Sequence, residues 1–189
     1  GEGPSVGYTF VGWNCGGMRG DASGRKLALT RFCTARSCSI SGVMLQEHHL
    51  GTQQGEDLTK ELRLLGWEAR FDCRDDNSAS RGTAILINPR CLNGVSRDNV
   101  KFSGGLDGTI TTAEIQIPNT PPIHLASIYI PPDTSQKIET MRRIINSGMI
   151  NKDTIMEGDH NMVEQPRLET AGMPNYQNRG ADEWFGYLA

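Results

Sequence analysis

The sequence lacks the long apolar runs, the paired cysteines and the excess of basic residues that mark several broad classes of protein. No segment approaches the roughly 18 consecutive apolar residues that a membrane-spanning helix needs, and residues 1–7 have neither the basic start nor the apolar centre of a secretory signal. With 19 Lys and Arg against 22 Asp and Glu, a net charge of -3 argues against strong, indiscriminate binding to polyanions. We therefore expect a protein that does not insert into a membrane.

The five cysteines are an odd number and form no C-x-x-C pair, which argues against both a disulfide framework and a zinc ribbon. A reducing intracellular compartment is the simplest location for such a chain. A length of 189 residues, 37% of them hydrophobic, allows one domain with a sizeable core. The composition therefore predicts a single domain over residues 1–189.

Short β-branched runs alternate along the chain with a few stretches of helical period. The patterns predict a mixed α/β domain, with helices over residues 26–36, from Asp57 as N-cap to Gly66, and from Asp133 or Thr134 to Gly148. We expect Gly158 to break the last strand. The expected strands cover residues 8–13, 40–46, 67–73, 83–88, 109–117, 123–130 and 153–156.

Polar side chains of the kind that bind metals and phosphates follow or end several of these strands. Residues at the ends of neighbouring strands converge on one rim of a sheet, so groups far apart in the sequence can meet around one ligand. These strand-end residues are Asn14, Glu47, Tyr129, Asp159 and Asn161.

Three of these residues carry specific chemistry. Glu47 follows an apolar strand and offers a hard oxygen ligand suited to Mg²⁺, although a glutamate there can equally be a solvated charge. Asp159 and Asn161 lie two residues apart and point the same way if the chain stays extended. An aspartate there can accept a proton from an attacking water while the amide holds that water or a phosphate oxygen, or the two can form an Asx-turn.

Other polar residues have simpler interpretations. His48 and His49 are adjacent in an extended segment, so they point to opposite faces and can hardly bind one ion. His160 faces away from Asp159 by the same argument, which favours packing or a surface position. Arg81 either lines a groove for a DNA backbone or belongs to a solvated turn.

Taken together, the motifs resemble those of the endonuclease/exonuclease/phosphatase superfamily over about residues 6–165. Leu45-Gln46-Glu47-His48-His49 and Gly158-Asp159-His160-Asn161-Met162-Val163-Glu164 are most similar to the apurinic-type endonuclease domain of non-LTR retrotransposons. The motifs that carry the wider resemblance are Trp13-Asn14, Gln46-Glu47, Gly82-Thr83-Ala84-Ile85-Leu86-Ile87, Tyr129 with Pro131, and Gly158-Asp159-His160-Asn161.

This resemblance implies a two-sheet α/β sandwich flanked by helices and phosphodiester hydrolysis that depends on Mg²⁺, or on Mn²⁺ in its place. For the retrotransposon branch, it implies nicking of target DNA in the nucleus to provide a primer for reverse transcription. Glu47 resembles the metal-binding glutamate, and Asp159 the aspartate that activates the attacking water. Asn161 and Asn14 would position water and phosphate, and the Tyr129 hydroxyl would contact the scissile phosphate.

Two departures from the family pattern keep other functions open. Many relatives carry Asp or Asn where this chain has Gly16, and the family ends in an S-D-H motif, whereas no histidine follows His160. We therefore expect the C-terminal part of the domain to be absent. A catalytically inactive fragment is one alternative. Another is a superfamily phosphatase or phosphodiesterase acting on lipid or inositol phosphates, or an RNA deadenylase.

Overall fold

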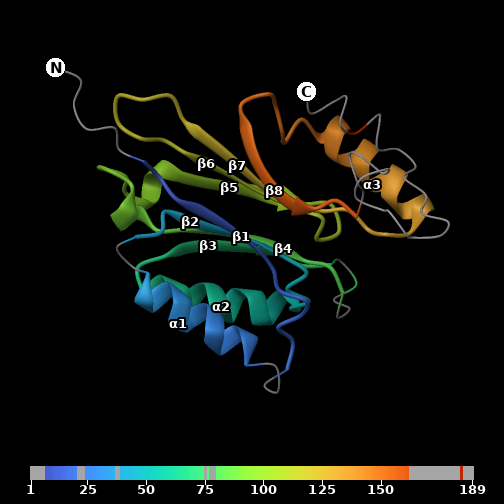
Figure 1. Ribbon diagram of the computed structural model, residues 1–189, viewed down its shortest axis with the longest axis horizontal. Coiled ribbons are helices and arrows are strands. Elements are labelled where there is room, and N and C mark those ends of the chain that lie inside the picture. The colour runs from blue at the N-terminus through green and yellow to red at the C-terminus, as the bar shows by residue number, and fades with distance from the viewer. Residues whose placement is uncertain are drawn as a thin grey trace, which may run out of the picture.

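A computed structural model places two four-stranded sheets face to face, with helices on their outer sides (Figure 1). It describes residues 7–20, 24–36, 39–74, 76, 80–161 and 184. Two helices cover the outer face of the first sheet, and a third lies on the outer side of the second (Figure 1). The layers are therefore helix, sheet, sheet, helix, as the α/β sandwich prediction requires.

The first sheet is built from the N-terminal half of the chain and the second from the C-terminal half. The strands are β1 (Phe10–Asn14), β2 (Gly42–Gln46), β3 (Glu68–Asp72), β4 (Thr83–Ile87), β5 (Val100–Gly105), β6 (Ile110–Ile115), β7 (Ile123–Tyr129) and β8 (Thr154–Asp159). The α-helices are α1 (Arg25–Ala35), α2 (Thr52–Leu64) and α3 (Thr134–Ser147), with short 3₁₀ turns at Pro89–Cys91 and Arg97–Asn99.

Each sheet contains one parallel pair of strands joined through a helix. Sheet one has the order β1-β2-β4-β3, and α1 connects the parallel strands β1 and β2. Sheet two has the order β5-β6-β7-β8, and α3 connects the parallel strands β7 and β8. All other pairings are antiparallel. Because parallel strands end at the same edge, each helix connection brings two strand ends together at one rim.

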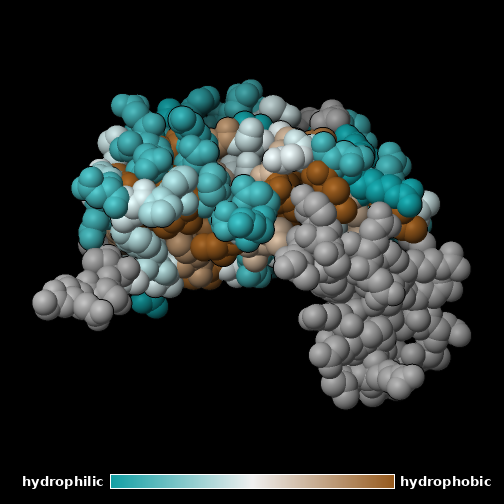
Figure 2. Space-filling model, turned by 90° about the horizontal axis from the view of Figure 1, so that it is seen from above, coloured by the Kyte–Doolittle hydropathy of each residue, from teal (hydrophilic) through white to brown (hydrophobic). Residues whose placement is uncertain are grey.

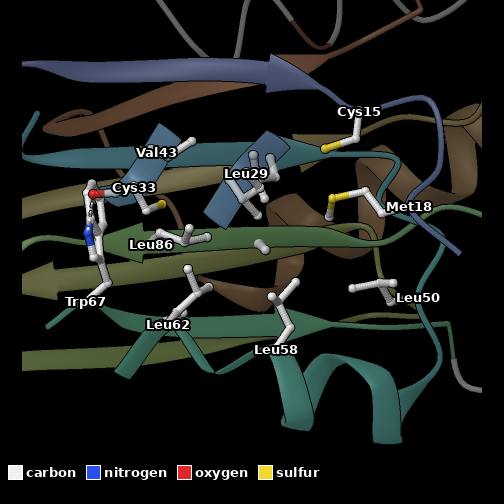
Figure 3. Packing of buried hydrophobic residues seen from close by; sticks show 13 residues of the cluster. Cys15, Met18, Leu29, Cys33, Val43, Leu50, Leu58, Leu62, Trp67 and Leu86 are labelled. Carbon is white, nitrogen blue, oxygen red and sulfur yellow. Dashed lines mark hydrogen bonds between the residues drawn. The ribbon is translucent and has the colours of Figure 1, made fainter. Parts of the chain in front are cut away.

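The outer face of sheet one packs against α1 and α2 through a continuous apolar cluster (Figure 3). Leu58 and Leu62 of α2 lie one helical turn apart and are fully buried, as their spacing predicts. Trp67 is also fully buried, and its indole Nε1 donates a hydrogen bond to the Cys33 carbonyl oxygen of α1 (3.2 Å). This bond ties the end of α1 to the start of β3.

The outer face of sheet two packs against α3 through a second cluster, which includes Ile128, Met141, Ile144 and Trp184. Seen from that side, the described residues show a mainly hydrophilic surface with hydrophobic patches between the polar side chains (Figure 2). Within the described ranges, no helix combines the length and apolar character needed to cross a membrane.

Most of the predicted elements are present, with boundaries shifted by one or a few residues. The Asp133 N-cap of α3 is confirmed, since its carboxylate accepts hydrogen bonds from the Ser135 and Gln136 backbone N–H groups. Gly148 ends α3 in the left-handed conformation, as predicted. Strand β5 has no counterpart among the predicted elements, because only four residues alternate before its sequence ends in two glycines.

Two sequence predictions are wrong. Asp57 is not an N-cap, because α2 begins at Thr52 and the Gln54 side chain caps the Gly51 backbone N–H (3.0 Å). Gly158 does not break β8, which continues to Asp159. The glycine is needed there for close packing, since a Cβ at Gly158 would lie 2.4 Å from the Ile128 carbonyl oxygen of β7.

Candidate functional site

Four of the five predicted site residues stand at strand ends on one rim of the sandwich. Asn14 is the last residue of β1, and Glu47 follows β2 directly. Tyr129 and Asp159 are the last residues of β7 and β8 and are paired in register across the parallel ladder. The fold therefore delivers one pair of residues from each sheet to the same end of the molecule.

The Asn14 amide joins the two carboxylates of the site. Its Nδ2 donates to Glu47 Oε1 (3.0 Å) and to Asp159 Oδ2 (3.1 Å), although Asp159 lies 145 residues away in the chain. The Gly16 backbone N–H donates to Asn14 Oδ1 (3.0 Å), which fixes the orientation of the amide. Gly16 has φ +55°, a conformation that favours glycine, so the residue that departs from the family pattern orients Asn14 through its backbone.

Asn161 adjoins the site. Asp159 and Asn161 are predicted to lie on the same side only if the chain stays extended, and the chain is not extended at Asn161. Its φ is +46°, and its backbone N–H donates to Asp159 Oδ1 (3.0 Å), which is the Asx-turn alternative. Its Nδ2 donates to the Ile130 carbonyl oxygen (2.8 Å). Lys137 of α3 is buried, and its Nζ donates to the Asn161 carbonyl oxygen (2.7 Å). The turn after β8 is thus held from both β7 and α3.

Tyr129 is 9% exposed and lies in the electrostatic field of the two carboxylates. Burial and then the negative charges of Glu47 and Asp159 raise the pKa of its hydroxyl above the usual value, and Arg81 acts in the opposite direction. The phenol therefore stays protonated at neutral pH and keeps its capacity to donate a hydrogen bond.

The two histidines that follow Glu47 have different environments. His48 is fully buried, and its Nε2 donates toward the Asp72 and Thr83 carbonyl oxygens while Nδ1 accepts from the Leu50 N–H (3.0 Å). Burial lowers the pKa of His48 to about 4. His49 has a different partner, with Nε2 3.5 Å from Glu47 Oε2. The two histidines therefore have separate partners, although the chain is not extended at His49, where φ is +56°. That they cannot share one ion stays a prediction.

His160 packs away from the carboxylates, as predicted. The Trp184 indole Nε1 donates to His160 Nδ1 (3.1 Å), and the two rings are in contact. Burial lowers the pKa of His160, and the Asp159 charge partly compensates. The residues Met162, Val163 and Glu164 of the last motif lie outside the described part of the chain.

Sequence reasoning did not place His49, Arg81 or Lys137 in the site. The Arg81 guanidinium forms an ion pair with Asp107 and donates to Gln136 of α3, and its side chain is only 13% exposed. The Arg81 carbonyl oxygen also accepts from the His49 N–H (2.9 Å). The contacts of the Arg81 and Lys137 side chains join segments distant in sequence, so no local pattern shows where these two side chains lie. His49 follows Glu47 by two residues, and its place next to that carboxylate had a local signal.

Several non-glycine residues at this rim have positive φ angles. They are Glu47 (54°), His49 (56°), Arg81 (59°) and Asn161 (46°). Such conformations cost free energy in residues that carry a Cβ, and they gather where function requires a particular side-chain direction. The concentration of strained residues around Asn14 therefore supports a functional site at this end of the sandwich.

The donor set of the rim fits a hard divalent cation. Among the described residues, no group of three or more His, Cys, Asp and Glu side chains is placed to hold a metal ion. Mg²⁺, however, is commonly held by one or two carboxylates and completes its shell with water and substrate phosphate oxygens. Glu47 and Asp159, joined through one amide, provide two such carboxylates.

Comparison with known proteins identifies the fold. No family model and no curated protein matches the sequence. Among solved structures, the chain is similar to the AP endonuclease LMAP from Leishmania major, with 18% identity and a TM-score of 0.55 over 83% of this chain and 56% of that one. The chain is also similar to the catalytic domain of APE2 from Xenopus laevis, with 15% identity and a TM-score of 0.53 over 93% of this chain and 66% of that one.

An endonuclease/exonuclease/phosphatase from Beutenbergia cavernae has 14% identity and a TM-score of 0.52, over 94% of this chain and 52% of that one. The chain therefore spans between half and two thirds of the length of these three structures. Its two sheets and flanking helices form the endonuclease/exonuclease/phosphatase type of α/β sandwich.

Proposed function

We propose that this chain belongs to a Mg²⁺-dependent phosphodiesterase that nicks DNA, the endonuclease part of a retrotransposon reverse-transcriptase polyprotein. The observation that carries the proposal is the Asn14 amide, which bridges Glu47 and Asp159 at the rim. An arrangement that holds two carboxylates together at an accessible rim suits phosphoryl transfer, which requires a placed nucleophile and stabilisation of the charge on the phosphate.

Glu47 would hold the cation, Mg²⁺ or Mn²⁺, with the Asp159 carboxylate beside it on the same Asn14 amide. When bound, such a cation supplies Lewis-acid stabilisation of the charge on the scissile phosphate. The carboxylate of Asp159 accepts a proton from the attacking water, and Asn14 keeps that carboxylate turned toward Glu47. The amide nitrogen of Asn161 is bonded to Ile130, so its Oδ1 is the atom that can orient the water.

Two further groups would bind the phosphate. The Tyr129 hydroxyl remains protonated and donates a hydrogen bond to a phosphate oxygen. Arg81 is held by Asp107 and Gln136, and it adds positive charge near the Tyr129 hydroxyl. A fixed cation and a fixed donor need little reorganisation when charge develops, which is the main electrostatic requirement of such a site.

The assignment to a retrotransposon, and with it a nuclear location, is supported by the Gln46-Glu47-His48-His49 and Gly158-Asp159-His160-Asn161 motifs. Both motifs lie at strand ends on the proposed rim. The substrate in this proposal is double-stranded DNA, cut on one strand.

The proposal is tested by relaxation of supercoiled plasmid with Mg²⁺, with Mn²⁺ and with EDTA. We expect metal-dependent nicking that falls by about 10²-fold or more in Glu47→Gln and Asp159→Asn, since each removes a group that acts in the transition state. Glu114→Gln on β6 and Asp153→Asn before β8 are the matched controls, and neither should change the rate.

Parallel assays with a phosphomonoester, an inositol phosphate and polyadenylated RNA separate the substrate classes. Hydrolysis of one of these without plasmid nicking would replace the proposed substrate. Nicking that is unchanged in Glu47→Gln and Asp159→Asn would refute the site.

A further inference from the structure

The interface between the two sheets changes character along the strands. Most of it is an apolar end built from Met44, Ile85, Ile87, Ala113, Ile115 and Leu125. Next to the site, the facing side chains become polar while remaining buried. This polar layer consists of Gln46, Thr83 and Asp72 from sheet one and Ser127 and Thr111 from sheet two, each at most 7% exposed.

The polar layer follows one rung of each sheet. In sheet one, Gln46 is paired in register with Asn14 on one side and with Thr83 on the other, and Thr83 is paired with Asp72. In sheet two, Ser127 is paired with Thr111 and with Glu157. The rung of sheet one therefore runs from the buried Asp72 to Asn14, whose amide organises the site.

Hydrogen bonds satisfy the polar layer across the interface. Gln46 Nε2 donates to Ser127 Oγ (2.9 Å) and to the Glu157 carbonyl oxygen (3.4 Å), and Ser127 Oγ donates to the Leu45 carbonyl oxygen (2.7 Å). At the far end, the Thr83 hydroxyl donates to Thr111 Oγ1 (2.9 Å), because the Thr111 hydroxyl itself bonds to Asp72 Oδ2 (2.8 Å). Buried polar groups with defined partners accept only one arrangement of the two sheets, whereas apolar contacts tolerate sliding.

The residues joined by the hydrogen bonds of Gln46 lie one or two positions before the site residues in the chain. Gln46 directly precedes Glu47, Ser127 lies two residues before Tyr129, and Glu157 lies two residues before Asp159. Residues two apart in a strand share a face, so Ser127 and Tyr129 both face sheet one. The bonds of Gln46 thus connect β2, which Glu47 follows, with β7 and β8, which end in Tyr129 and Asp159.

We propose that Gln46 and Ser127 are positioning residues, whose buried hydrogen bonds set the distance between the rim of sheet one and the rim of sheet two. This inference rests on the proposed function. The two residues touch neither water nor phosphate, and they act by keeping the Glu47 and Asp159 carboxylates within reach of the single Asn14 amide. A misplacement of about 1 Å in such a site can cost about 10²-fold in rate.

The test compares Ser127→Ala and Gln46→Met with Leu125→Ala, which alters the same face of β7 two residues away in the apolar end. The first readout is the side-chain amide resonance pair of Asn14 in a ¹⁵N-labelled protein, and the second is kcat and KM for plasmid nicking. We expect both polar variants to shift the Asn14 resonances and to lower kcat by about 10-fold to 10²-fold with little change in KM. Leu125→Ala should leave the resonances and kcat unchanged, even if it lowers stability more.

Two outcomes overturn the inference. One is that Ser127→Ala and Gln46→Met leave the Asn14 resonances in place. The other is that Leu125→Ala moves them as far, which would reduce the polar layer to a general contribution to stability. The resonances are measured without substrate, so a failure of the wild-type protein to nick DNA would refute the proposed function and leave this readout to decide the positioning role.

Discussion

The apolar end and the polar layer of the inter-sheet interface use opposite means to hold the same two sheets together. At the apolar end, Ile85 and Ile115 are fully buried among other aliphatic side chains. In the polar layer, Gln46 and Thr111 are just as buried but each has specific hydrogen-bond partners. Apolar burial contributes most of the free energy of folding, while net hydrogen bonds contribute only about 1 kcal/mol each. The polar layer therefore contributes little to the free energy of folding, but it specifies one arrangement of the two sheets.

The largest effect on stability is expected from the apolar end. Leu125→Ala should lower the free energy of unfolding by about 2–5 kcal/mol, because it removes buried methyl groups and leaves a cavity. Urea unfolding at neutral pH measures this change. Leu64→Ala, at a side chain that is 89% exposed on α2, is the control and should cost far less. Equal losses of stability in the two variants would contradict the burial of Leu125 in the apolar end of the interface.

Acid should weaken the polar layer through His48, which bonds to the backbone of Asp72 and Thr83. Burial lowers the pKa of His48 to about 4 from an ordinary value of 6.5. Its neutral form therefore stabilises the fold fully above pH 6.5, and this contribution is lost as the pH falls from 6.5 toward 4. The loss is about 3 kcal/mol, because the unfolded chain binds the proton more readily.

Urea unfolding in EDTA across this pH interval measures the effect. His48→Gln should be less stable at neutral pH and should lose less stability on acidification. The control is His124→Gln, at a partly exposed position on β7, which should keep the pH dependence of the wild type. A wild-type profile that is flat between pH 6.5 and 4 would be incompatible with the neutral, buried His48.

The smallest effect is expected at Gly104, which makes room for the polar layer on β5. A Cβ there would lie 2.1 Å from Asp72 Oδ2 and 2.7 Å from the Ile110 carbonyl oxygen. Gly104→Ala should therefore cost about 1–3 kcal/mol, since the strand and the carboxylate must shift. Thermal unfolding measures this loss. Gly7→Ala, where no atom lies within 4 Å of the new methyl group, should be close to neutral, and the idea fails if both variants behave alike.

Much of the fold could be predicted because each helix and most strands carry a local signal. The apolar run before Glu47 marked β2, and Asp133 and Gly148 marked both ends of α3. Errors arose where one residue type serves two purposes. Glycine is typical of a strand end, yet Gly158 lies within β8 and permits close contact with β7. Aspartate is typical of a helix N-cap, yet the Gln54 side chain and not Asp57 accepts a hydrogen bond at the start of α2.

The candidate site could be predicted only in part. The positions of Asn14, Glu47 and Asp159 at strand ends are visible in the sequence, and parallel pairing brings such ends together. The bridge that Asn14 makes between the two carboxylates is not visible, since it depends on how the two sheets stack. The same is true of Arg81, whose place is set by contacts with a hairpin turn and with α3.

The parallel ladder between β7 and β8 has a consequence for how this chain can change during evolution. Tyr129 and Asp159 are aligned by strand register, and the loop from 149 to 153 that leads into β8 lies at the opposite end of the strand. Insertions in that loop can accumulate without altering which residues meet at the rim. A slip of β8 by a single residue, by contrast, would turn the carboxylate to the outer face and bring a glycine or a histidine in its place.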